Sequence, residues 1–268
     1  MDHFDMLENK SIYVIREAYY RFRNVAMLWS VGKDSTTLLW LIRKAFFGKI
    51  PFPVIHIDTG YKFPEMYQFR DRLSREWGFP LLVGKNERKI EERMGPDKGM
   101  KLDCCTELKT NALKLVIQKY GFKAIFLGIR RDEHGIRGKE RYFSPRDDQF
   151  QWNYENQPAE IWDQYKSFLD DEEEHYRVHP ILHFTELDIW RYVKRENLPI
   201  IGLYFSREGR RFRSIGCVPC CSPVESPASN IDEIIEEIRI SKHSERAGRA
   251  QDKEDIYTMQ KLRALGYM

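Results

Sequence analysis

The sequence predicts an α/β fold with a doubly wound, mostly parallel sheet and an irregular, helical C-terminal part. A short, continuous apolar segment occurs at residues 25–29, and further segments of strand length occur at residues 53–57, 80–83 and 124–127. Segments with the apolar spacing of helices alternate with them, at residues 36–47, 64–77 and 106–120. Strands that are apolar throughout are typical of parallel sheets covered on both faces. This order of elements therefore favours a sheet flanked by helices on both sides.

The expected helices of the first half carry recognisable end signals. Residues 11–22 are expected to form the first helix, with Ser11 as its N-cap. Its apolar positions recur at helical spacing, at Ile12, Ile15, Tyr19 and Phe22. Pro64 lies near the start of the helix that follows the second strand, where proline is tolerated. Gly121 closes the helix that precedes the fourth strand and is a common C-terminal cap.

The second half of the chain is less regular. Residues 130–177 are rich in charged and aromatic side chains and show few strand or helix signals. Further helices are expected at residues 185–196, 230–241 and 252–265. No internal repeat or low-complexity linker divides the chain, so residues 1–268 are expected to form a single domain. Residues 1–200 would form its α/β core, and residues 201–268 a cysteine loop and a C-terminal helical tail.

Composition and charge narrow the class of protein. The chain has 268 residues, of which 42% are hydrophobic, enough for one sizeable domain. Its 44 basic and 41 acidic residues nearly balance, which does not indicate a dedicated nucleic-acid-binding protein. The N-terminus has no signal-peptide core, and no apolar run approaches the roughly 20 residues that span a bilayer. We therefore expect a cytoplasmic protein without a membrane segment.

The segment Ser30-Val31-Gly32-Lys33-Asp34-Ser35 joins the first strand to the next helix. Gly32 is expected to let the backbone turn tightly and approach a ligand. The free N–H groups at the start of the helix favour an anion, and the serine hydroxyls and the charge of Lys33 add to this preference. An ordinary strand-to-helix turn is the alternative, but the strand–loop–helix context favours a phosphate site.

This loop resembles the Ser-Gly-Gly-x-Asp-Ser signature of the PP-loop ATP pyrophosphatases, with Val31 in place of the first glycine. Residues 56–60, 128–133 and 139–141 resemble further blocks of that family. Residues 244–249 are similar to the tail of sulfate adenylyltransferase small subunits, the branch that the chain resembles most. The resemblance covers nearly the whole chain and implies an adenine nucleotide alpha-hydrolase-like fold.

The resemblance implies an enzyme that binds ATP and cleaves it to AMP and pyrophosphate. The implied ATP-binding residues are Ser30, Gly32, Lys33, Asp34, Ser35, Asp58, Thr59, Gly60, Gly128, Arg246 and Arg249. Mg²⁺ is expected to bridge the phosphates, with Asp34 or Asp58 near it. For Arg246 and Arg249, a solvated helix end is the alternative to a position over ATP.

The expected catalytic residues are Lys33, Arg130 and Arg131. Lys33 is suited to the leaving pyrophosphate, because adenylyl transfer depends on positioning and on stabilisation of negative charge. Arg130 and Arg131 are suited to the attacking oxyanion, because a guanidinium group matches the geometry of sulfate or phosphate. A surface salt-bridge cluster is the alternative for the two arginines, but their place at the end of the fourth strand favours a ligand site.

The five cysteines fall in two clusters, Cys104-Cys105 and the loop from Cys217 to Cys221. In a reducing compartment this clustering indicates metal binding or redox chemistry. The layout resembles that of adenylyl-sulfate reductases with an iron–sulfur centre, which implies Cys104, Cys105, Cys217 and Cys220 as ligands of a [4Fe–4S] cluster. Zinc is the less favoured metal, and buried free thiols are the other alternative. No cysteine follows Cys221, so the reductase mechanism through a C-terminal thiol is not expected.

The sequence leaves three functions open and favours the first. The chain would adenylylate sulfate as the small subunit of a sulfate adenylyltransferase, with a separate GTPase large subunit, because it has no GTPase motif itself. Alternatively, it would activate a backbone phosphate for DNA phosphorothioation, with a cysteine desulfurase and DNA-modifying partners. The third function is a non-catalytic nucleotide-binding or iron–sulfur scaffold. A homo-oligomer is compatible with each of them.

Overall fold

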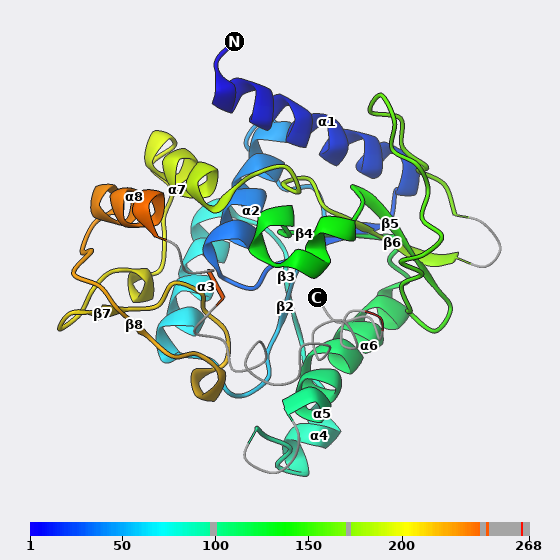
Figure 1. Ribbon diagram of the computed structural model, residues 1–268. Helices are drawn as coiled ribbons and strands as arrows, with labels where there is room; N and C mark the ends of the chain where they lie inside the picture. Colours follow the sequence, from blue (N-terminus) through cyan, green and yellow to red (C-terminus); the bar gives the residue numbers. More distant parts are fainter. Residues whose placement is uncertain (97–100, 170–172, 242–244, 247–263, 265–268) are drawn as a thin grey trace.

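The structure is a computed structural model that describes residues 1–96, 101–169, 173–241, 245–246 and 264 (Figure 1). Its strands are β1 (Val25–Leu28), β2 (Val54–Ile57), β3 (Leu81–Gly84), β4 (Ala124–Leu127), β5 (Phe143–Asp147), β6 (Glu173–Val178), β7 (Arg210–Arg211) and β8 (Val224–Glu225). Its α-helices are α1 (His3–Phe22), α2 (Lys33–Ala45), α3 (Pro64–Trp77), α4 (Glu87–Glu91), α5 (Lys101–Cys105), α6 (Ala112–Tyr120), α7 (Glu186–Arg195) and α8 (Ile231–Ile240). A π-helix (Thr106–Asn111) joins α5 to α6.

Six strands form one sheet in the order β3-β2-β1-β4-β6-β5. The first five strands of this order run parallel to one another. The last strand, β5, pairs antiparallel with β6. β1, β2 and β4 are buried along their whole length, as expected for the inner strands of a parallel sheet covered on both faces. The strand order reverses between β1 and β4, and open α/β sheets bind ligands outside the carboxyl ends of their strands at such a reversal.

Helices cover the sheet on both sides (Figure 1). α1 packs against α2 and against β1, β4 and β6, whereas α6 packs against β3. The crossovers β1–α2–β2 and β3–α6–β4 run in opposite directions along the sheet, so the right-handed rule places α2 and α6 on opposite faces. This arrangement confirms the predicted doubly wound, mostly parallel α/β fold.

α1 begins earlier than the sequence suggested. It starts at His3 rather than at residue 11, because Asp2 and Asp5 form a capping box. Ser11 is therefore not an N-cap but lies inside the helix. Its buried hydroxyl donates to the carbonyl oxygens of Leu7 and Pro180.

Two strands lie in the stretch 130–177, where few signals were found. β6 carries His175 and Arg177 at buried positions, so the hydropathy pattern does not reveal it. β5 contains Pro145 and is an edge strand, where the missing N–H is tolerated. The two strands extend the sheet beyond β4 and correct the expectation of an irregular segment.

The C-terminal part contains the small β7–β8 sheet and α8, which packs against α7. Apart from Ala264, the helix expected at residues 252–265 lies outside the described residues. The division into residues 1–200 and 201–268 stays a prediction. Within the described part of the chain, no helix has the length and apolar character needed to cross a membrane.

Candidate functional site

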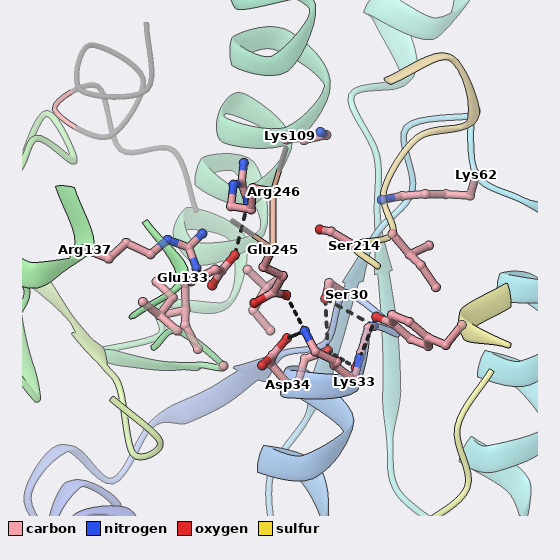
Figure 2. A pocket seen from close by; sticks show the side chains of 18 residues that line it. Ser30, Lys33, Asp34, Lys62, Lys109, Glu133, Arg137, Ser214, Glu245 and Arg246 are labelled. Atoms are coloured by element: carbon pink, nitrogen blue, oxygen red, sulfur yellow. Dashed lines mark hydrogen bonds and ion pairs between the residues drawn. The ribbon is translucent and has the colours of Figure 1, made fainter. Parts of the chain in front are cut away.

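A cleft opens at the carboxyl ends of β1 and β4, where the strand order reverses (Figure 2). Leu28 and Leu127, the paired last residues of these strands, line it. The cleft has a cavity volume of about 140 Å³. Its cationic lining residues are Lys33, Lys62, Lys109, Arg137 and Arg246, and its carboxylates are Asp34, Glu133 and Glu245.

The loop before α2 forms one wall of this cleft. Its left-handed residue is Val31, with φ 67°, whereas Gly32 has φ −77° and ψ 167°. The expectation that Gly32 supplies the tight turn is therefore wrong. Gly32 provides space instead, since a Cβ there would lie 3.3 Å from the Tyr204 hydroxyl and 3.4 Å from Ser30 Oγ. The side chain of Val31 is buried and anchors the loop in the core.

Hydroxyl groups hold the loop in shape. Ser30 Oγ lies 3.0 Å from Ser35 Oγ, and Ser35 Oγ donates to the carbonyl oxygen of Gly32 at 3.1 Å. The backbone N–H of Lys33 donates to the Tyr204 hydroxyl at 3.0 Å. These bonds fix the start of α2 at the cleft, where the positive end of the helix dipole favours an anion.

A network of buried charges lies beside the loop. Arg130 Nε donates to Asp34 Oδ1 at 2.6 Å, and Lys33 Nζ donates to Asp34 Oδ2 at 2.9 Å. Both cations also donate to the carboxylate of Glu245, one to each oxygen (Figure 2 shows the Lys33 contact). Arg130 reaches Asp132 as well, at 2.6 Å. The side chains of Lys33 and Arg130 are 1% and 0% exposed, so these charges interact in a poorly solvated environment.

The partners keep the members of this network ionised. Burial would raise the pKa of Asp34, but the charges of Arg130 and Lys33 outweigh it and lower that pKa to about 2. Burial would also raise the pKa of Glu245, yet Arg130 and Lys33 lower it. Burial would lower the pKa of Lys33, but the charges of Asp34 and Glu245 outweigh it and raise that pKa. Lys33, Arg130, Asp34 and Glu245 are therefore charged at neutral pH.

A second set of charges lines the rim of the cleft. Arg246 Nη1 donates to Glu133 Oε1 at 3.1 Å, and Arg137 pairs with the other oxygen of Glu133. Lys62 lines the same cleft on the side away from Glu133 and Arg137 (Figure 2), and Lys109 lines it as well. Several cations thus face one opening, as the binding of a polyanionic ligand requires.

The structure brings only part of the predicted site together. Ser30, Gly32, Lys33, Asp34, Ser35, Gly128 and Arg246 line the cleft. Arg130 lies in the charge network next to it, and Arg131 stacks on the ring of Tyr142 at 5.2 Å. Asp58 accepts hydrogen bonds from the Gly60 N–H at 2.9 Å and from the Tyr67 hydroxyl at 2.7 Å. Arg249 lies outside the described residues.

The four predicted metal ligands, Cys104, Cys105, Cys217 and Cys220, line a common cavity next to the cleft. Thr59 belongs to this cavity, and its hydroxyl lies 3.2 Å from Cys217 Sγ. Lys109 lines both the cavity and the cleft, and its Nζ lies 3.7 Å from Cys105 Sγ.

Metal geometry is not formed at this cavity. Among the described residues, no group of three or more histidine, cysteine or acidic side chains is arranged to hold a metal ion. Burial, reinforced by the neighbouring cysteines, raises the pKa of Cys104 to about 12. The four thiols are therefore collected in one place, where burial disfavours the thiolate form of Cys104.

Sequence reasoning missed several residues of the cleft. Tyr204, Lys62 and Ser214 line it from segments without a recognised motif. Lys109 lies within the helix expected at residues 106–120, and Glu245 lies within the tail resemblance at residues 244–249, but neither was predicted as a site residue. Only the tail resemblance around Glu245 carried a signal that could have found it.

The fold and this site define a PP-loop protein. Residues 24–223 match the phosphoadenosine phosphosulfate reductase domain, and the chain belongs to this family. The chain is similar over its whole length to sulfate adenylyltransferase subunit 2. The subunit from Pseudoalteromonas translucida is 41% identical over 297 aligned residues, which cover 100% of this chain and 99% of that protein. The subunit from Serratia proteamaculans is also 41% identical and covers 100% and 98%.

Solved structures agree on the fold. FMN adenylyltransferase from Candida glabrata, in complex with FAD and inorganic pyrophosphate, superposes with a TM-score of 0.58 over 98% of this chain and 83% of that chain. Phosphoadenylyl-sulfate reductase from Candida auris superposes with a TM-score of 0.56 over 84% and 97%. Their sequence identities are 19% and 16%, so the likeness confirms the fold alone.

Proposed function

We propose that this chain transfers the adenylyl group of ATP to sulfate, as the small subunit of a sulfate adenylyltransferase. The observation that carries this proposal is the cleft at the strand reversal, where the loop before α2 and buried cations converge. The full-length similarity to sulfate adenylyltransferase subunit 2 supports sulfate as the acceptor. The same relatives do not favour DNA phosphorothioation.

In this reaction a sulfate oxygen attacks the α-phosphorus of ATP, and the bond from that phosphorus to the β-phosphate oxygen breaks. Pyrophosphate leaves as the adenylyl–sulfate bond forms. Lys33 and the start of α2 would hold the leaving pyrophosphate, since both present positive charge to the cleft. Arg130 would stabilise negative charge on the reacting oxyanions through its guanidinium group.

Arg131 is less suited to the role predicted for it, because it stacks on Tyr142 rather than lining the cleft. Mg²⁺ would neutralise charge on the phosphates when bound. Asp34 lines the cleft and Asp58 does not, which favours Asp34 as the carboxylate near the ion.

A separate large subunit is part of this proposal, since the relatives are named as one subunit of an enzyme. The resemblance implies a GTPase in this position. A cysteine desulfurase, DNA-modifying partners and a homo-oligomer stay untested predictions.

The test is pyrophosphate release by the purified chain with its GTPase partner, ATP and GTP, with and without sulfate. We expect sulfate-dependent release that falls by about 100-fold or more in Lys33→Met, as for other residues that stabilise developing charge. Lys194→Met is the matched control, because Lys194 is exposed on α7 and forms an ion pair with the exposed Asp232. Release without dependence on sulfate, or ATP binding without release, would contradict the proposal.

We also propose that Cys104, Cys105, Cys217 and Cys220 hold a [4Fe–4S] cluster, with zinc as the alternative. Their common cavity and their number support this proposal, because four thiolates are the ligand set of such a cluster. A bound cluster would cross-link α5 to the loop around Cys217 next to the cleft. The test is anaerobic purification followed by measurement of iron, acid-labile sulfide and zinc. Protein without any of them after anaerobic reconstitution would contradict a metal site.

A further inference from the structure

Glu245 contacts Lys33 and Arg130, the two cations that bind phosphate and sulfate oxygens in the proposed function. Its carboxylate bridges Lys33 and Arg130, with one oxygen on each (Figure 2 shows the Lys33 contact). The Glu245 side chain is 6% exposed and lines the cleft. A carboxylate and a phosphate present similar pairs of oxygens to a guanidinium group, so one can replace the other at Arg130.

Glu245 occupies the two buried cations that an anion at the loop would contact. The network contains two cations, Lys33 and Arg130, and three carboxylates, those of Asp34, Asp132 and Glu245. A phosphate that approached Lys33 with Glu245 in place would meet the carboxylates of Glu245 and Asp34 in a poorly solvated environment, where like charges repel strongly.

Glu245 can leave Lys33 and Arg130 more easily than Asp34 can. Asp34 belongs to the first turn of α2 and stays beside Lys33 through the backbone of that helix. Glu245 comes from a segment distant in sequence, 212 positions from Lys33. Its two contacts with Lys33 and Arg130 can therefore be exchanged for contacts with a ligand without unfolding α2.

We propose that Glu245 is a built-in competitor of the substrate anion, which occupies Lys33 and Arg130 in the nucleotide-free protein and is displaced when phosphate binds. This inference rests on the anion site of the proposed function. Displacement costs part of the binding energy, so the apparent affinity for ATP is lower than the intrinsic affinity of the open site. The competitor also keeps the two buried cations paired while no ligand is present, which avoids the cost of unpaired buried charge.

The test is calorimetric titration of the full chain with magnesium pyrophosphate, in wild type, Glu245→Gln and Glu245→Asp. We expect both variants to bind pyrophosphate at least about tenfold more tightly, because charge contacts of this kind contribute more than a factor of ten. Glu245→Asp keeps the charge but is too short to bridge both cations. The Glu245→Asp variant therefore distinguishes competition for Lys33 and Arg130 from a general effect of the negative charge. Glu236→Gln is the matched control, because Glu236 is an exposed carboxylate on α8.

The outcomes separate this inference from the proposed function. If wild type binds pyrophosphate and both Glu245 variants bind it equally or more weakly, the anion site remains and the competition is overturned. Tighter binding in Glu245→Gln alone shows a charge effect and also overturns it. Absence of binding in every protein removes the anion site, and the proposed function with it.

A second measurement uses wild type alone and does not depend on folding of the variants. Hydrogen exchange at the backbone amides of Glu245 and Arg246 is compared with and without pyrophosphate. Displacement predicts faster exchange when pyrophosphate is bound. Unchanged or slower exchange would show that Glu245 stays in place and would overturn the inference.

Discussion

Gly128 touches the backbone of Ser35 so closely that no side chain fits between them. A Cβ on Gly128 would lie 2.9 Å from both the Cα and the N of Ser35. This contact joins the loop after β4 to the first turn of α2, which form two walls of the same cleft. The glycine is required here by the close approach of two backbone segments, not by a left-handed conformation.

Gly128→Ala is expected to lower the free energy of unfolding by about 1–3 kcal/mol, because backbone must shift to admit the methyl group. The shift also moves Ser35, so ATP should bind more weakly. Urea denaturation and ATP titration measure the two effects. Gly135→Ala is the control, since no other atom lies within 4 Å of a Cβ built there. Equal stability of the two variants would contradict the prediction.

Tyr204→Phe removes the acceptor for the backbone N–H of Lys33. Tyr204 is buried, so the N–H loses its partner without access to bulk water. We expect the free energy of unfolding to fall by about 1–3 kcal/mol, the usual cost of an unsatisfied buried donor. Tyr20→Phe, at an exposed tyrosine, should change stability far less in the same denaturation experiment. A similar loss in both variants would argue against the role of the hydroxyl.

Acid should destabilise the protein in part through His56, whose ring nitrogen Nδ1 lies 3.0 Å from the carbonyl oxygen of Trp29, just before the loop. Burial lowers the pKa of His56 to about 3, whereas an unfolded histidine has a pKa of about 6.5. The stabilisation is complete above about pH 6.5 and is lost as the pH falls towards 3, because the unfolded chain binds the proton first. The maximum slope is about 1.4 kcal/mol per pH unit.

Urea unfolding of wild type and His56→Gln between about pH 7 and pH 5 tests this slope, within the window set by the two pKa values. The variant should lose less stability across that range. A slope in His56→Gln equal to that of wild type would exclude His56 as a source of acid sensitivity.

Cys220→Ser is expected to lower the iron content after anaerobic purification, since Cys220 lines the cavity shared by the predicted ligands. Cys221→Ser should leave the iron content unchanged, because Cys221 is not among the residues that line that cavity. Iron analysis and visible absorbance of the two variants provide the measurement. Equal iron loss in both would show that the assignment of the fourth ligand is wrong.

The sequence predicted the elements whose cause is local. β1 and β4 are continuously apolar, and α3 and α6 end at left-handed glycines, Gly78 and Gly121. These features depend on neighbouring residues, which the sequence displays directly. β6 depends instead on buried polar residues such as Arg177, whose burial is decided by packing across the sheet.

The candidate site also has parts that the sequence displays locally and parts that only the fold brings together. The loop before α2 was found because six consecutive residues form it, and the cysteines were found because they cluster in sequence. The bond between Tyr204 and Lys33 joins positions 171 apart, and the contact between Glu245 and Arg130 joins positions 115 apart. No motif links such positions, so only the folded chain shows that they meet.

Val31 has a backbone conformation that β-branched residues rarely adopt, and its side chain is buried under the loop. Such a conformation costs of the order of 1–3 kcal/mol and persists only where the surrounding packing enforces it. The loop is thus given its shape during folding, before any nucleotide arrives. Less conformational entropy remains to be lost at the moment of binding, so this chain exchanges some global stability for a rigid receptor.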